Sequence, residues 1–404
     1  MKRYLGTEKE INRKDFLQAI HQKGIASFCC TDPRVVECVL EQANLSQEYA
    51  LIEATSNQVN QTGGYVGMTP KQFVQNTRNI ATQISFDSHK LILGGDHIGP
   101  LPWRNLPARE AMRNAETLIT ECVKAGYTKI HIDTSMPLGD DPAVISPELK
   151  VERCVHLYQI AMAAYEELVS RKKNQPKPMF VIGTDVPFAG GLLMLNSITS
   201  PDALQHTLDL YQNAFAKAGC LDAFENIIAI VIELELDFNE TGTYLHEAVE
   251  RLKPIMQHFP NLVLEGHSTD YQSKQTLHLM KEDGIRIVKV GPALTYAHRE
   301  ALISLSQMEQ ERIPESKQAN YPWVLESAMI ENPIYWKDWY TGNEAELHQL
   351  RMHSKLDRGR YYMALPMVRN AEKELIGNLE SMGIEPNKLI QDSINEVVRT
   401  YMEA

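Results

Sequence analysis

Residues 91–100 read LILGGDHIGP, and this stretch decides how the rest of the chain is interpreted. An apolar run leads into two glycines, then into Asp96 and His97, and a Gly-Pro pair ends it. A nearly continuous apolar run is typical of a parallel strand that is covered on both faces. An acid and a histidine at the end of such a strand indicate a functional loop if other strands end in the same way.

Seven other stretches share this pattern of a short run rich in Ile, Val and Leu. They are GIASFCCTD (24–32), YALIEATS (49–56), KIHIDTS (129–135), MFVIGTD (179–185), IAIVIELELD (228–237), LVLEGHSTD (262–270) and IRIVKVGP (285–292). Segments with helical periodicity lie between them, such as 108–126 and 201–219, and a glycine ends each of these two. Eight strand–helix units in a row predict an α/β fold of the (β/α)8 TIM-barrel type.

A doubly wound open sheet is the alternative fold. Two features argue against it: no GxGxxG motif opens the first unit, and eight units are the number that closes a barrel. After residue 300 the pattern changes to helical stretches rich in aromatic residues, at 321–340 and 356–380. We therefore expect a TIM barrel over residues 1–305 and an α-helical C-terminal extension over 306–404, packed on the barrel without a linker.

The composition limits the kinds of protein this can be. A chain of 404 residues with 43% hydrophobic and 23% charged residues is typical of a globular protein. A net charge of −12 without a basic stripe argues against nucleic acid as a partner. No apolar stretch approaches the roughly 20 residues that span a bilayer, and MKRYLGTEKE lacks the apolar core of a secretory signal. We expect a cytoplasmic protein with no membrane partner and with reduced cysteines.

Nearly every predicted strand ends in an ionisable residue. Helix capping explains Asp32, Asp133 and Asp270 about equally well. Capping does not explain why all eight strands end in this way, and a barrel brings these ends together around one mouth. The residues concerned are Asp32, Glu53, Asp96, His97, Asp133, Asp185, residues 233–237, Glu265, His267 and Lys289.

Imidazoles and carboxylates from different strands suit a divalent metal such as zinc, with one position open to substrate. His97 and His267 are the best ligand candidates, because each follows a strand and is flanked by small residues. Glu265 lies two residues before His267, so both side chains project to the same face and either one serves as the ligand. The alternative is a hydrogen-bonded histidine at the rim without metal. We expect His131, inside an apolar run, to be a core or rim residue rather than a ligand.

Several long motifs, taken together, resemble one family. The chain is similar to the Z-type subunit family of class II D-tagatose-1,6-bisphosphate aldolase, over nearly its whole length. The motifs are LIEATSNQVNQTGGYVGMTP, LGGDHIGP, IHIDTS, VIGTDVP, GHSTDYQ, VKVGPALTYAHREAL, ESAMIENPIYWKDWY and LDRGRYY. The resemblance implies a TIM barrel, a role in galactitol, tagatose or amino-galactose catabolism, and a relationship to zinc-dependent aldolases. In those enzymes an Asp-His pair ends the third strand, where the acid handles a proton and the histidine binds zinc; Asp96 and His97 match this pair.

The chain departs from the aldolase pattern at other strands. The histidine that ends strand six in the aldolases is replaced here by ELELDF, so Asp237 or a neighbouring Glu would have to bind the metal. The seventh-strand histidine aligns more naturally with Glu265 than with His267. Asp185 matches the region where related enzymes carry an acidic residue before a glycine loop, and we assign it a catalytic role beside Asp96.

Three functions follow from the resemblance. The first is a component of the aldolase that breaks the C3–C4 bond of ketohexose phosphates. The second is a 4-epimerase that interconverts tagatose 6-phosphate and fructose 6-phosphate by cleavage and re-addition. The third is a stabilising subunit, without activity of its own, for a Y-type catalytic partner. The many ionisable strand ends favour an enzyme, and we also expect an oligomer.

The substrate-binding residues are predicted from their position at the mouth. The ends of strands seven and eight are the usual phosphate position in barrels, which indicates Ser268, Lys289 and Gly291. Arg358 and Arg360 in LDRGRYY could clamp a phosphate, although exposed helix arginines explain them equally well. Amides after strand two suit sugar hydroxyls. The full predicted set is Glu53, Asn57, Gln58, Asn60, Asp133, Ser268, Lys289, Gly291, Arg358 and Arg360.

Overall fold

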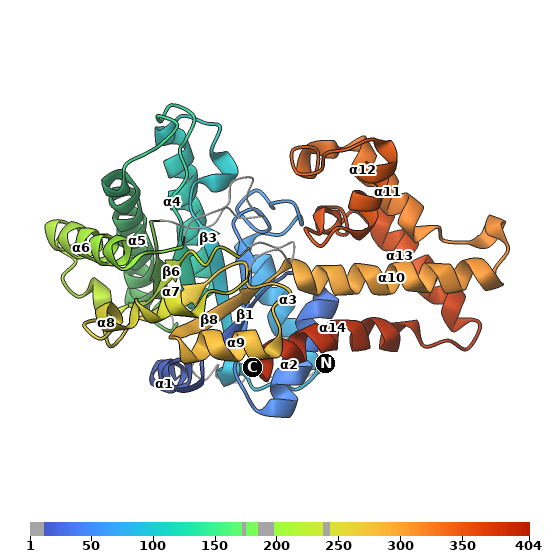
Figure 1. The fold of residues 1–404 in the computed structure, drawn as a ribbon, viewed down its shortest axis with the longest axis horizontal. Coiled ribbons are helices and arrows are strands. Elements are labelled where there is room, and N and C mark those ends of the chain that lie inside the picture. Colours follow the sequence, from blue (N-terminus) through green and yellow to red (C-terminus); the bar gives the residue numbers. More distant parts are fainter. Residues whose placement is uncertain (1–11, 172–174, 185–197, 237–242) are drawn as a thin grey trace.

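The computed structural model describes residues 12–171, 175–184, 198–236 and 243–404. Its centre is a closed barrel of eight parallel strands that follow one another in sequence order (Figure 1). The closed barrel confirms the TIM-barrel prediction and excludes the open sheet. The strands are β1 (Ile25–Cys29), β2 (Ala50–Thr55), β3 (Leu91–Ile98), β4 (Lys129–Ile132), β5 (Met179–Ile182), β6 (Ile227–Ile232), β7 (Val263–Gly266) and β8 (Ile285–Val290).

Helices cover the outside of the barrel, because the strands bury apolar side chains on their outer face as well. Proline at the first turn and a capping Ser, Thr or Asp begin several of these helices. The helices around the barrel are α1 (Arg13–Lys23), α2 (Pro33–Ser46), α3 (Pro70–Gln83), α4 (Ala108–Ala125), α5 (Pro147–Ser170), α6 (Pro201–Lys217), α7 (His246–Glu250), α8 (Lys253–Met256), α9 (Lys274–Glu282) and α10 (Pro292–Arg312).

The barrel interior changes character along its axis. Phe16 and Ile20 of α1 close the lower end and pack with a buried apolar cluster that includes Leu51 and Ile287. Two residues further along the same strands, the inward side chains are Glu53 and Lys289, and these are charged and buried. An apolar plug therefore lies beneath a charged layer, and the upper mouth lies beyond that layer.

The C-terminal extension is helical, as expected. It consists of α11 (Tyr321–Glu331), α12 (Glu344–His353), α13 (Pro366–Glu380) and α14 (Pro386–Met402). Helix α10 runs from the barrel through residue 305 into the extension, and α14 returns to pack on α10 and α2 (Figure 1). The division into residues 1–305 and 306–404 stays a prediction. Among the described residues, no helix is both long enough and apolar enough to cross a bilayer.

Candidate active site

Three histidines from three strands meet at the upper mouth of the barrel. His97 lies near the end of β3, His131 lies in β4, and His267 follows β7. Each pair of rings has its centroids 5.0 Å apart, and all three side chains are buried. Together with Asp96 they offer ligand atoms that all lie within 4.8 Å of one another. This set is the candidate metal centre.

His97 is held in an unusual backbone conformation. Its φ is 47°, in the left-handed region that residues with a side chain adopt rarely and at a cost. Its ring Nδ1 lies 2.7 Å from Oδ2 of Asp133, which fixes the orientation of the ring. Such an orienting carboxylate beside a histidine is typical of metal sites.

His131 and His267 are oriented by carboxylates in the same way. The Nδ1 of His131 lies 2.9 Å from Oδ1 of Asp96, and the Nε2 of His267 lies 3.0 Å from Oε1 of Glu265. The Nε2 of His131 is buried and has no hydrogen-bond partner. Orphaned buried polar atoms are rare in proteins and call for an explanation. Burial lowers the pKa of His267 to about 4, so the ring is neutral at pH 7, as a metal ligand must be.

These observations test whether the residues fit a metal. A buried set of three imidazoles and one carboxylate is a donor set that zinc and similar divalent ions accept. The unpartnered Nε2 of His131 gives this set a nitrogen that nothing else in the described chain uses. The residues present therefore fit a divalent ion.

A layer of buried charges supports the candidate metal centre from below. The ammonium of Lys129 lies 3.0 Å from Oε1 of Glu53 and 2.9 Å from Oε2 of Glu265. The ammonium of Lys289 lies 2.5 Å from Glu53, 3.5 Å from Glu265 and 2.9 Å from Oδ1 of Asp96. Burial by itself would raise the pKa of Asp96, but electrostatic interactions with His97 and Lys289 outweigh it and hold that pKa well below its ordinary value. Asp96 is therefore a carboxylate at neutral pH.

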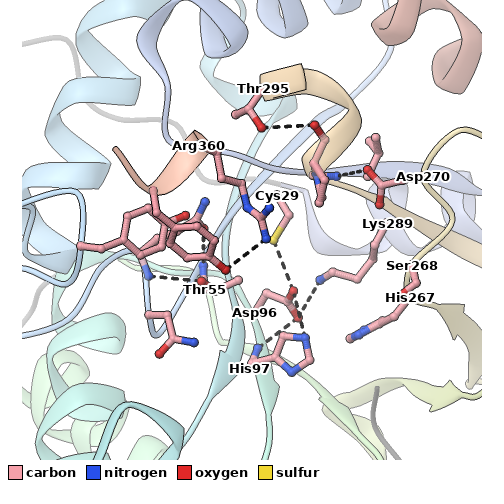
Figure 2. A pocket seen from close by; sticks show the side chains of 17 residues that line it. Cys29, Thr55, Asp96, His97, His267, Ser268, Asp270, Lys289, Thr295 and Arg360 are labelled. Atoms are coloured by element: carbon pink, nitrogen blue, oxygen red, sulfur yellow. Dashed lines mark hydrogen bonds and ion pairs between the residues drawn. The ribbon is translucent and has the colours of Figure 1, made fainter. Parts of the chain in front are cut away.

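A pocket of about 90 Å³ opens above these groups. Asp96, His97 and His267 form one side of it, and Asn57 and Gln58 contribute amides from the loop after β2. Arg360 and Tyr361 of the C-terminal extension also line this pocket, and Figure 2 shows Arg360 among the lining side chains. The other lining residues are Cys29, Thr55, Tyr65, Ser268, Asp270, Lys289, Val290, Gly291, Pro292 and Thr295.

Comparison with known proteins assigns the chain to a family. The family model described as "D-tagatose-1,6-bisphosphate aldolase subunit GatZ/KbaZ-like" matches residues 11–404. The chain belongs to this family. The match spans nearly the whole GatZ/KbaZ-like chain and confirms the resemblance inferred from the motifs.

The chain is also similar to solved structures. The crystal structure of "a probable tagatose 6 phosphate kinase" from Sinorhizobium meliloti 1021 is 34% identical and has a TM-score of 0.85, covering 94% of this chain and 99% of its own. A putative fructose-1,6-biphosphate aldolase from Coccidioides immitis is 12% identical with a TM-score of 0.45, over 90% of this chain and 99% of its own. The YdjI aldolase from Escherichia coli K12 has the same identity and TM-score, over 93% of this chain and 99% of its own. The last two likenesses are too distant to support an argument about function.

The predicted metal ligands of this GatZ/KbaZ-like chain are partly brought together. His97 and His267 lie in the cluster, while Glu265 contacts His267 and the buried lysines instead of joining the four grouped ligands. His131, for which we expected a core or rim position, is buried in β4 and also lies in the cluster, and a role for it as a ligand is a proposal. The third histidine comes from β4, not from the sixth strand. Asp237 and the predicted catalytic Asp185 lie outside the described residues.

The predicted substrate residues do not all line the pocket. Asn57, Gln58, Ser268, Lys289, Gly291 and Arg360 line the pocket. Glu53 and Asp133 lie behind it, in the charged layer and against His97. The Oδ1 of Asn60 accepts from the backbone of Thr62 and Gly64, which shapes its own loop.

The two arginines of LDRGRYY lie close together, because Arg358 and Arg360 both donate to the Tyr361 hydroxyl, at 3.3 Å and 3.1 Å. The guanidinium of Arg358 lies 3.6 Å from the ring centroid of Trp339 and does not line the pocket, whereas Arg360 does. A phosphate clamp formed by both arginines stays a prediction.

Asp270 lines the pocket, and the sequence left helix capping and a role in the site equally open for it. Its Oδ1 accepts the N–H of Gly291 at 3.0 Å and the N–H of Ala293 at 2.8 Å, at the first turn of α10. Burial raises the pKa of Asp270 to about 6. The only signal in the sequence was its place at the end of the GHSTD motif.

Proposed function

We propose that this chain binds a divalent metal ion, with zinc as the expected metal, and breaks the C3–C4 bond of a ketohexose phosphate. His97, His131 and His267 would hold the ion, and Asp96 lies beside them. The observation that carries the proposal is the buried, unpartnered Nε2 of His131 inside a cluster of three histidines. Such an ion supplies Lewis acidity toward substrate oxygens and stabilises the negative charge that develops on them as the bond breaks.

The protein's own residues supply the proton transfer. Oδ1 of Asp96 is occupied by the His131 ring and by the ammonium of Lys289. Oδ2 of Asp96 contacts the Cys29 thiol at 3.3 Å and faces the pocket side of the cluster. This oxygen is placed to accept the proton of the C4 hydroxyl and to return it when the bond re-forms.

The pocket orients the sugar for this chemistry. The amides of Asn57 and Gln58 and the hydroxyl of Ser268 line the wall and are suited to sugar hydroxyls. Asp133 keeps the His97 ring in one orientation. These groups hold the substrate and the ligands in place before reaction, which is how positioned sites lower a barrier.

A 4-epimerase is the second candidate, and the cover over the pocket favours it. Arg360 and Tyr361 of the extension lie over the mouth, so an aldehyde fragment would be retained. A retained aldehyde that turns its other face before the bond re-forms gives the epimer at C4, whereas release gives an aldolase. A Y-type aldolase subunit is the partner that we propose for either activity.

The test uses the purified full chain with equimolar zinc. We expect about one bound metal per chain by mass spectrometry, and turnover of tagatose 6-phosphate or tagatose 1,6-bisphosphate. Formation of fructose 6-phosphate identifies the epimerase, and release of triose products identifies the aldolase. Asp96→Ala and His97→Ala should each lower kcat by at least about 100-fold. Absence of both bound metal and turnover would contradict the proposal and favour the stabilising subunit.

A further inference from the structure

A buried ion pair outside the pocket links the barrel to the segment that carries Arg360 and Tyr361. Arg299 lies on α10 and Asp357 lies in the C-terminal extension, and both side chains are fully buried. We infer that this pair is a positioning element, which holds Arg360 and Tyr361 at the pocket wall and so sets the affinity of the pocket for its substrate without taking part in the reaction. The inference rests on the proposed function, because it concerns binding of that substrate in the same pocket.

Arg299 belongs to the barrel side of this contact. It lies on α10, the helix that directly follows β8, and it does not itself line the pocket. Its Nε lies 2.7 Å from Oδ1 of Asp357, and its Nη1 and Nη2 donate to the carbonyl oxygens of Met352 and Ser354, the latter at 3.3 Å. Glu300 contributes a second carboxylate, 3.4 Å from Nη1. One planar guanidinium therefore binds three points of the 352–357 segment.

Asp357 is bound to α10 through both of its carboxylate oxygens. While Oδ1 pairs with Arg299, Oδ2 accepts the hydroxyl of Thr295, a pocket residue of α10, at 2.5 Å. The φ of Asp357 is 45°, in the left-handed region that a residue with a side chain keeps only where its surroundings hold it there. The contacts with α10 therefore hold this turn of the extension in its conformation.

The same turn orients the two residues of the pocket wall. Residues Arg358–Tyr361 form a short 3₁₀ helix directly after Asp357. The Nη1 of Arg360 donates to the carbonyl oxygens of Leu356 at 2.6 Å and Asp357 at 2.8 Å, and its Nη2 donates to the Tyr361 hydroxyl at 3.1 Å. Figure 2 shows Arg360 among the side chains that line the pocket. A shift of Asp357 would therefore move the acceptors that orient Arg360.

The turn packs directly on Arg299, and a glycine makes this close approach possible. A Cβ on Gly359 would lie 3.0 Å from Cδ and 3.3 Å from Nε of Arg299. The turn also contacts the loop after β2 through Tyr361, whose ring centroid lies 4.6 Å from that of Tyr65. A contact between two aromatic rings is weaker than a buried pair with several charge-assisted hydrogen bonds. We therefore expect the ion pair, and not the ring contact, to fix the position of the wall.

Two substitutions of Asp357 test the inference in the zinc-loaded full chain. Asp357→Asn keeps the size of the side chain and suits the left-handed backbone, whereas Asp357→Ala removes both acceptors. Calorimetry should show that tagatose 6-phosphate binds about 3- to 10-fold more weakly to Asp357→Asn and about 30- to 100-fold more weakly to Asp357→Ala. Hydrogen exchange at residues 354–361 should be faster in both variants. Zinc content should not change, and kcat should stay within about 3-fold while KM rises.

Asp141→Asn is the matched control. Asp141 forms a comparable ion pair with Arg153, at 2.6 Å, and neither of these residues lines the pocket. This variant should change neither the affinity for tagatose 6-phosphate nor the hydrogen exchange at residues 354–361. The control therefore separates a local effect on the wall from a general loss of stability.

Three results would overturn the inference. They are unchanged exchange at residues 354–361 in both Asp357 variants, faster exchange there with the affinity of the wild-type protein, or a lower kcat with an unchanged KM. If the wild-type protein binds no tagatose 6-phosphate, the proposed function fails. In that case hydrogen exchange at Arg360 and Tyr361 alone decides whether the ion pair positions them, so the two failures are distinguishable.

Discussion

At the residue scale, the alternation of side chains along β4 explains where His131 lies. Lys129, His131 and Asp133 lie at every second position of KIHID, so in an extended strand they share one face. Ile130 and Ile132 lie between them and pack in the outer core. This alternation places His131 on the inner face of the barrel, between a buried lysine and a buried aspartate, where we propose that it is a metal ligand.

The role of His131 leads to a prediction about metal binding. His131→Ala should lower the bound metal to well below one ion per chain and kcat by at least about 100-fold, because it removes the unpartnered nitrogen of the cluster. Metal content by mass spectrometry and steady-state kinetics measure both effects. The control is His258→Ala, an exposed histidine outside the barrel mouth, which should keep both values. If the His131→Ala variant still bound one metal ion per chain, His131 would not be a metal ligand.

At the element scale, the segment of β3 and its following loop approaches β4 closely because positions 94 and 99 are glycine. A Cβ on Gly94 would lie 2.5 Å from Oε1 of Glu53 and 2.9 Å from the carbonyl oxygen of Lys129. A Cβ on Gly99 would lie 1.8 Å from the carbonyl oxygen of Asp133. The glycines in LILGGDHIGP therefore make room for the charged layer and for the approach of Asp133 to His97.

Gly94→Ala tests this close approach. The new methyl group would displace Glu53, which two buried lysines hold in place, so the free energy of unfolding should fall by about 2–4 kcal/mol. Urea unfolding measures the change. Gly377→Ala is the matched control: this glycine is exposed in α13 with no heavy atom within 4 Å of the added Cβ, and the variant should gain roughly 0.5–1 kcal/mol. If the free energy of unfolding of Gly94→Ala fell by less than about 0.5 kcal/mol, the charged layer would be able to accommodate the added methyl group.

At the scale of the whole molecule, a buried histidine links the barrel to the extension. Nδ1 of His298 on α10 lies 3.4 Å from Asp32, the N-cap of α2, and its Nε2 lies 3.5 Å from Glu372 on α13. Arg34 also pairs with Glu372, at 2.8 Å. Burial alone would lower the pKa of His298, but the two carboxylates outweigh burial and raise it to about 9. His298 is therefore charged at neutral pH and joins three elements.

This pairing predicts how stability depends on pH. The pKa of His298 in the folded protein lies above its ordinary value of 6.5. Its contribution to the free energy of unfolding is therefore complete below pH 6.5 and is lost as the pH rises through 9. The wild-type protein should exceed His298→Gln by roughly 2–3 kcal/mol in unfolding free energy at pH 6, and this difference should shrink toward pH 10. Urea unfolding of both proteins at several pH values measures the difference. A difference that does not change with pH would show that His298 is neutral in the folded protein.

The sequence by itself determined the barrel and part of the site. Eight apolar runs with intervening helical periodicity can bury their strands on both faces only in a closed parallel barrel or an open sheet, and their number selected the barrel. The adjacent apolar run is enough to place a polar residue at the end of a strand. For this reason Asp96, His97 and His267 could be predicted from the sequence. The tertiary structure decided the rest. Whether His131 meets two other histidines, whether Asp270 fills the turn at Gly291, and which of Arg358 and Arg360 reaches the pocket depend on distances between segments far apart in the chain. Local periodicity fixes the face on which a side chain lies, but only the closed barrel and the returning extension fix what that face meets.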